Sequence, residues 1–180
     1  MHRPTGAVSI DADFFTFADE QRLLAPLVSW LLRSVTAGMP VTLSEDHVDL
    51  VAAAPRPVDV MINFDFHMDL TVDFLLGAPA APPTDASVFE SLVAKGMSRR
   101  YVWAHPVSRR ETAARVYTTA LLAARQPLLA KVHCVPGAEA MSMVDQLDVV
   151  WAFVCRSPGF ATTKTDEAFA LLVRAGGHGR

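Results

Sequence analysis

Short apolar runs alternate with longer stretches of helical spacing along this chain. The clearest run, Val58 to Phe64, is almost continuously apolar, which is typical of a central parallel strand covered on both faces. Further short runs predict strands at 7–10, 41–43, 100–104, 128–135 and 148–155. Helical spacing predicts helices at 21–35, 48–54, 87–95, 111–125, 138–146 and 165–175, the last closed by Gly176 and Gly177.

Strands that alternate with helices predict an α/β fold. We expect one domain over residues 1–180, built as a three-layer αβα sandwich around a mostly parallel sheet. In such sheets, ligands bind beyond the carboxyl ends of the strands. The residues that directly follow the predicted strands are therefore the first place to look for chemistry.

The composition indicates a packed globular protein. The chain has 180 residues, of which 51% are hydrophobic and 19% are charged, so it can bury a core and is not disordered. Its mean hydropathy of +0.26 is high for a protein without membrane spans. Strands buried on both faces and a homo-oligomer interface are two uses for this apolar surface.

Charge and apolar runs exclude two classes of partner. A net charge of −3 and a pI near 6.0 argue against nucleic acid, which needs a basic face. The longest uncharged apolar run, 23–32, contains a proline and is shorter than the roughly 20 residues that span a membrane. Asp11 and Asp13 fall where a secretory signal would need an apolar core.

Cys134 and Cys155 lie in apolar stretches, which indicates reduced thiols in a cytoplasmic protein, with a disulfide between them as the alternative.

Six side chains that could bind a metal follow three of the predicted strands. They are Asp11, Asp13, His47, Asp65, His67 and Asp69. If residues 65–69 continue extended, their three donors point to one side and can converge. Oxygen and nitrogen donors without a thiolate favour a divalent ion such as Mn²⁺, and six of them are enough for two ions.

The competing interpretation is that each acidic residue only begins a solvated loop or caps a helix. For Asp11 and Asp13 taken separately, this interpretation and the metal-ligand interpretation both remain open. The apolar residues directly before Asp65 argue against it there, because an unpaired buried carboxylate is costly.

These segments resemble the metal-binding motifs of the arginase (ureohydrolase) superfamily, which are G-G-D-H, D-A-H-x-D and D-x-D. The matching pieces are Asp46-His47, Asp65-Phe66-His67-Met68-Asp69 and Asp11-Ala12-Asp13. Together with residues 101–106 and 156–160, they look most like the small peptide arginases. Those enzymes convert arginine to ornithine in ribosomally made precursor peptides and release urea.

The resemblance implies an arginase-like fold, two Mn²⁺ ions and an arginine-containing precursor peptide as the substrate. By the family pattern, one ion would be held by Asp11, His47, Asp65 and Asp69, and the other by Asp11, Asp13, Asp65 and His67. Asp11 and Asp65 would then bridge the two ions. Such a pair lowers the pKa of a shared water and supplies hydroxide to attack the guanidinium carbon.

A further histidine follows the fourth predicted strand. His105, which precedes Pro106, is the candidate for proton transfer to the leaving amine, and a hydrogen-bonded structural histidine is the alternative.

The chain also departs from ordinary arginases. Its D-x-D precedes its D-x-H-x-D, which is the reverse order, and Ser44-Glu45 stands where the family has two glycines. Free arginine is therefore not implied as the substrate, and so short a core leaves an open site that suits a peptide. Two alternatives remain: another ureohydrolase or deacetylase acting on a small C–N substrate, and a catalytically silent metal-binding domain.

Overall fold

The computed structural model describes residues 2–75, 78–80, 82–84, 87–114 and 131–177. These residues form an α/β fold with one six-stranded sheet, in which all paired strands are parallel. The strands are β1 (Thr5–Asp11), β2 (Val41–Ser44), β3 (Val58–Phe64), β4 (Ser98–His105), β5 (Val132–Pro136) and β6 (Asp148–Cys155). The helices are α1 (Ala18–Thr36), α2 (Leu50–Ala53), α3 (Val72–Leu75), α4 (Val88–Ala94), α6 (Gly137–Val144) and α7 (Thr163–Gly177).

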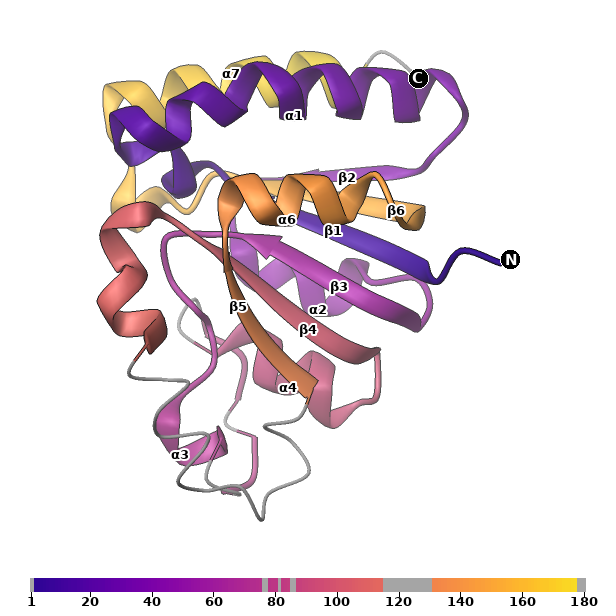
Figure 1. Ribbon diagram of the computed structural model, residues 1–180, viewed down its shortest axis with the longest axis vertical. Helices are drawn as coiled ribbons and strands as arrows, with labels where there is room; N and C mark the ends of the chain where they lie inside the picture. Colours follow the sequence, from indigo (N-terminus) through magenta and orange to yellow (C-terminus); the bar gives the residue numbers. More distant parts are fainter. Residues whose placement is uncertain (1, 76–77, 81, 85–86, 115–130, 178–180) are drawn as a thin grey trace.

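Helices cover both faces of the sheet, as the sequence pattern predicts (Figure 1). Helices α1, α6 and α7 pack on one face, against strand residues such as Ile10 and Val154. Helices α2, α3 and α4 pack on the other, against residues such as Met61 and Phe153. Because successive side chains of a strand point to opposite faces, a strand buried on both sides must be apolar throughout.

The strand order is β2-β6-β1-β3-β4-β5, so β1 and β3 are neighbours in the middle of the sheet. The chain leaves β1 into α1 on one face and leaves β3 into α3 and α4 on the other (Figure 1). Connections that turn to opposite faces leave a crevice between the carboxyl ends of their strands, which is where parallel α/β sheets bind ligands.

The predicted strands 58–64 and 148–155 coincide with β3 and β6. Most of the predicted helix 111–125 and the start of the strand 128–135 lie outside the described residues. The prediction that Gly176 and Gly177 close the last helix is wrong, because α7 continues through both. A Cβ at Gly176 would lie 3.0 Å from the Leu43 side chain, so this glycine lets α7 approach β2 closely. In the described part of the chain, no helix has the length and apolar character needed to cross a membrane.

Candidate metal centre

The structure brings the six predicted donors together at the carboxyl ends of β1 and β3. Asp11, Asp13, His47, Asp65 and Asp69 are all buried. The sixth donor, His67, is the accessible one, with 30% of its side chain exposed. Most of the centre is therefore shielded from solvent and is reached from the side of His67.

The donors converge through tight turns. Strand β3 ends at Phe64, so the expectation of an extended segment from Asp65 to Asp69 is wrong. Asp65 instead bends the chain by accepting a hydrogen bond from the His67 backbone N–H at 2.7 Å. Asp69 then adopts a left-handed backbone with φ of 55°, which is uncommon for a residue other than glycine.

A similar turn, in which an aspartate carboxylate accepts a hydrogen bond from the backbone N–H two residues later, follows β1. Asp11 ends the strand, and its carboxylate accepts a hydrogen bond at 3.0 Å from the backbone N–H of Asp13. Asp13 lies in the 3-10 helix Ala12–Thr16, and its own carboxylate accepts a bond from the Phe66 backbone N–H at 3.1 Å. The two turns are therefore tied directly to each other.

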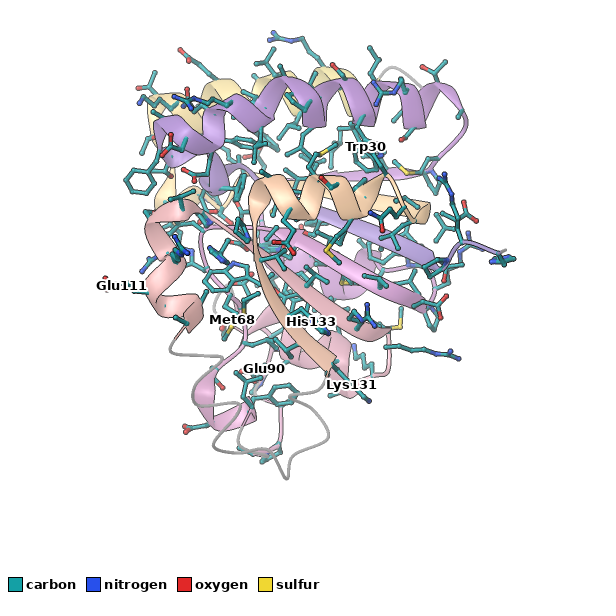
Figure 2. The ribbon with its side chains drawn as sticks, viewed as in Figure 1. Trp30, Met68, Glu90, Glu111, Lys131 and His133 are labelled. Carbon is teal, nitrogen blue, oxygen red and sulfur yellow. The ribbon has the colours of Figure 1, made fainter. Side chains whose placement is uncertain are left out.

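The loop after β3 is anchored to its neighbours at three points. The Trp103 indole N–H donates to the backbone oxygen of Asp65 at 2.9 Å, and the Tyr101 hydroxyl donates to that of Met68 at 2.8 Å. The Glu90 carboxylate on α4 accepts from the Thr71 N–H at 2.7 Å. Met68 and Glu90 both lie on the lower side of the sheet in Figure 2. These bonds fix the ligands before any ion binds, which preorganises the centre.

His47 faces three carboxylates. Its Nδ1 atom lies 3.3 Å from Asp11 Oδ2, and 3.2 Å from the Oδ2 atoms of both Asp65 and Asp69. A metal with ligands about 2.1 Å away at right angles separates neighbouring ligand atoms by about 3.0 Å. His47 Nδ1 and Asp69 Oδ2 are both buried, and neither has a hydrogen-bond partner among the described residues. This spacing, with orphaned donor atoms facing inward, fits a divalent cation.

The tautomer of His47 also suits a ligand. Its other nitrogen, Nε2, lies 3.2 Å from the Ser9 hydroxyl, which is buried in β1. If Nε2–H donates to this oxygen, Nδ1 is left with a lone pair directed at the three carboxylates.

A second group of donors adjoins the first. Asp13, Asp65 and His67 can each direct a ligand atom to a common point, and His67 Nδ1 lies 3.0 Å from Asp13 Oδ2. Asp65 also belongs to the group of His47 and Asp69. Asp65 is therefore common to both groups of donors.

Crowded buried carboxylates leave the centre short of positive charge. Burial, together with the charges of Asp65 and Asp11, raises the pKa of Asp13 to about 8. Burial, together with Asp69 and Asp11, also holds the pKa of Asp65 well above its ordinary value. Each carboxylate opposes ionisation of the next, so bound cations would relieve a strong repulsion.

The pKa values of Asp11 and His47 shift against the direction that burial alone would give. Burial alone would raise the pKa of Asp11, but the nearby His47 and the Ser157 hydroxyl lower it below its usual value. Burial alone would lower the pKa of His47, yet Cys155 and the surrounding carboxylates raise it well above its ordinary value. A positive charge at the position of His47 Nδ1 is thus what this environment favours.

Three further side chains lie at the centre and are not among the six predicted donors. Ser157, after β6, donates a hydrogen bond from its hydroxyl to Asp11 Oδ2. Asn63 Nδ2 donates to Asp65 Oδ2 at 3.1 Å. Cys155, a buried free thiol, groups with Asp11 and His47, so a sulfur donor does adjoin the oxygen and nitrogen donors. For Ser157 and Cys155, sheet order was the missing signal, because it puts the end of β6 beside that of β1.

His105 lies at the carboxyl end of β4 and is buried. Its Nδ1 lies 2.8 Å from the backbone oxygen of Pro106, and its ring packs against Trp103. Within the described residues it makes no hydrogen bond or ion pair with the six donors. Proton transfer by His105 stays a prediction. The contact with Pro106 is also the one that the alternative, a hydrogen-bonded structural histidine, would make.

Aromatic rings line the open side of the centre. The His67 ring lies 4.3 Å from that of Phe160 and 5.0 Å from that of Phe66. Phe66 in turn contacts Phe17, and the Arg109 guanidinium lies 4.0 Å above its ring. Phe17 and Phe160 are 43% and 48% exposed. We call Phe17, Phe66 and Phe160 the aromatic rim.

No protein-family model and no curated protein sequence matches this chain. Its chemistry is therefore inferred from its own residues. These form clusters of buried carboxylates and imidazoles that could hold a metal ion, at the ligand-binding edge of a parallel sheet.

Proposed function

We propose that this protein is a metal-dependent hydrolase of C–N bonds that converts arginine in a peptide to ornithine and urea. The observation that carries the proposal is the pair of donor groups that share Asp65 at the carboxyl ends of β1 and β3. The likeness of its motifs to those of peptide arginases supports the choice of reaction. Within this proposal the substrate is a ribosomally made precursor peptide, and the two ions are Mn²⁺.

The contacts support two ligand sets. His47 Nδ1 with Asp11, Asp65 and Asp69 would hold one ion, and Asp13, His67 and the shared Asp65 would hold the other. Asp11 as a second bridge rests on the resemblance to the family pattern alone. When bound, two such ions would lower the pKa of a shared water far below that of free water, which would make hydroxide available at neutral pH.

The chemistry balances with water as the only co-reactant. Water adds its oxygen to the guanidinium carbon, the bond between this carbon and the side-chain nitrogen breaks, and that nitrogen leaves as the ornithine amine. The leaving amine takes up a proton, the step for which His105 is the candidate.

The aromatic rim supports a peptide as the substrate. Two of its rings, Phe17 and Phe160, remain largely exposed beside the accessible ligand His67. Exposed aromatic rings can pack on the arginine side chain and on apolar residues that flank it in a peptide. Free arginine offers no flanking residues, so it would use less of this surface.

The direct test is release of urea. The Mn²⁺-loaded protein is incubated with a peptide that carries one arginine between apolar residues, and in parallel with free arginine and an acetyl-lysine peptide. We expect urea and an ornithine-containing product from the arginine peptide. Urea from free arginine alone would overturn the peptide assignment, and acetate from the acetyl-lysine peptide alone would indicate a deacetylase. Bound Mn²⁺ with no product from any substrate would leave a silent metal-binding domain.

Phe160 tests the role of the aromatic rim. Phe160→Ala is expected to raise KM for the arginine peptide about tenfold, since an aromatic contact of roughly 1–2 kcal/mol is lost, and to change kcat little. Steady-state urea release measures both constants. Leu32→Ala is the control, because Leu32 is 40% exposed and lies on α1. An unchanged KM in Phe160→Ala would contradict docking at the rim.

A further inference from the structure

Ser157 stands out among the residues around the centre because its backbone conformation suits its residue type poorly. Its φ is 49° and its ψ 74°, in the left-handed region that favours glycine. It also precedes Pro158, and a following proline restricts a residue's backbone further. Non-glycine residues in such conformations persist where the surroundings hold them, most often at functional sites.

The hydroxyl of Ser157 does not serve the local backbone. Ser157 precedes the 3-10 helix Pro158–Phe160, a position where serine commonly caps the helix, but its side chain makes no capping bond. The buried hydroxyl instead donates to Asp11 Oδ2. That oxygen is the one that faces His47 Nδ1.

The chain on either side holds Ser157 in place. Arg156 forms ion pairs with Asp166 at 2.9 Å and with Glu45 at 3.3 Å, which tie the end of β6 to α7 and to the turn after β2. On the other side, the backbone oxygen of Ser157 accepts a hydrogen bond from the Phe160 N–H at 3.0 Å. The strained conformation is thus fixed from both sides.

We propose that Ser157 is a positioning residue that directs Asp11 Oδ2 toward the ion held with His47, a role that rests on the proposed metal centre. The hydroxyl occupies one lone pair of this oxygen and leaves the other for the ion. Partners that orient a ligand in this way commonly contribute 10- to 100-fold to metal affinity. This contribution explains why serine, and not glycine, occupies a left-handed position.

Two substitutions separate the hydroxyl from the backbone. Ser157→Ala removes the hydroxyl and keeps the strain, whereas Ser157→Gly removes the hydroxyl and relieves the strain. We expect both variants to bind Mn²⁺ about 10- to 100-fold more weakly, as measured by the electron paramagnetic resonance signal of free Mn²⁺. Without metal, Ser157→Gly should melt at or above the temperature of the wild-type protein.

Ser98→Ala is the matched control. Ser98 is also buried, but it lies at the far end of β4 and donates to the backbone oxygen of Arg100. This variant should bind Mn²⁺ as the wild-type protein does. Wild-type affinity in Ser157→Gly would overturn the positioning role and leave the metal centre standing. A wild-type protein that binds no Mn²⁺ would overturn the proposed centre and the positioning role together.

Discussion

Replacement of Asp65 by alanine is expected to abolish binding of both ions. Asp65 is the carboxylate common to the two donor groups, so its loss removes a ligand from both proposed ions. The loss of Mn²⁺ affinity should exceed the roughly 100-fold that removal of an outer partner causes, and urea release should fall to background. Metal content after dialysis against Mn²⁺ and the urea assay measure the two effects.

Loss of the fold would mimic this result, so stability must be followed as well. Asp65→Asn keeps the shape of a protonated aspartate and removes one member of a repelling set. Without metal, this variant should be at least as stable at pH 8 as the wild-type protein, although it no longer bridges two ions. Asp59→Asn, on the same strand but hydrogen-bonded to Thr5 at its other end, should keep both ions. Two bound ions per chain in Asp65→Ala would contradict the assignment of Asp65 as the bridge.

The central elements of the fold were predictable because both faces of the sheet are covered. Burial on two sides makes β3 and β6 almost continuously apolar runs, and such runs have clear ends. The end of α7 was not predictable, because Gly176 serves a contact with β2 and not the end of a helix. Only tertiary packing distinguishes these two uses of glycine.

The six proposed donors could be named from the sequence, but the reason they converge could not. Alternation along a strand predicted the convergence of Asp65, His67 and Asp69, whereas a side-chain hydrogen bond and a left-handed residue produce it. Ser157 and Cys155 were missed as neighbours of Asp11 because they lie more than 140 positions away in sequence. Pairing of β1 with β6 brings them together, and no local pattern reports that pairing.

The titration of the centre predicts how stability changes with pH in the metal-free protein. The pKa of Asp13 is about 8 in the folded state, against an ordinary value of 3.8. Between these values the folded protein holds a proton that the unfolded chain has lost, so stability falls as pH rises. The raised pKa values of Asp65 and His47 act with the same sign. Asp11, whose pKa is lowered, acts only at more acidic pH.

We therefore expect the melting temperature of the metal-free protein to fall by roughly 5–10 °C from pH 6 to pH 8, from one proton over two pH units. Mn²⁺ should reverse this trend, because an ion competes with protons for the same carboxylates and binds best where they are ionised. Its stabilising effect should thus be larger at pH 8 than at pH 6. Thermal melts with chelator and with Mn²⁺ at both pH values measure this.

Asp13→Asn supplies the internal check on this linkage. Without metal, the variant lacks a carboxyl group whose pKa is raised in the folded protein. Its melting temperature should therefore depend less steeply on pH than that of the wild-type protein. With Mn²⁺, it should gain less stability, since it keeps the ligands around His47 but lacks one ligand of the second group. A metal-free melting temperature that rises between pH 6 and pH 8 would contradict the crowding of carboxylates on which the proposed two-ion centre depends.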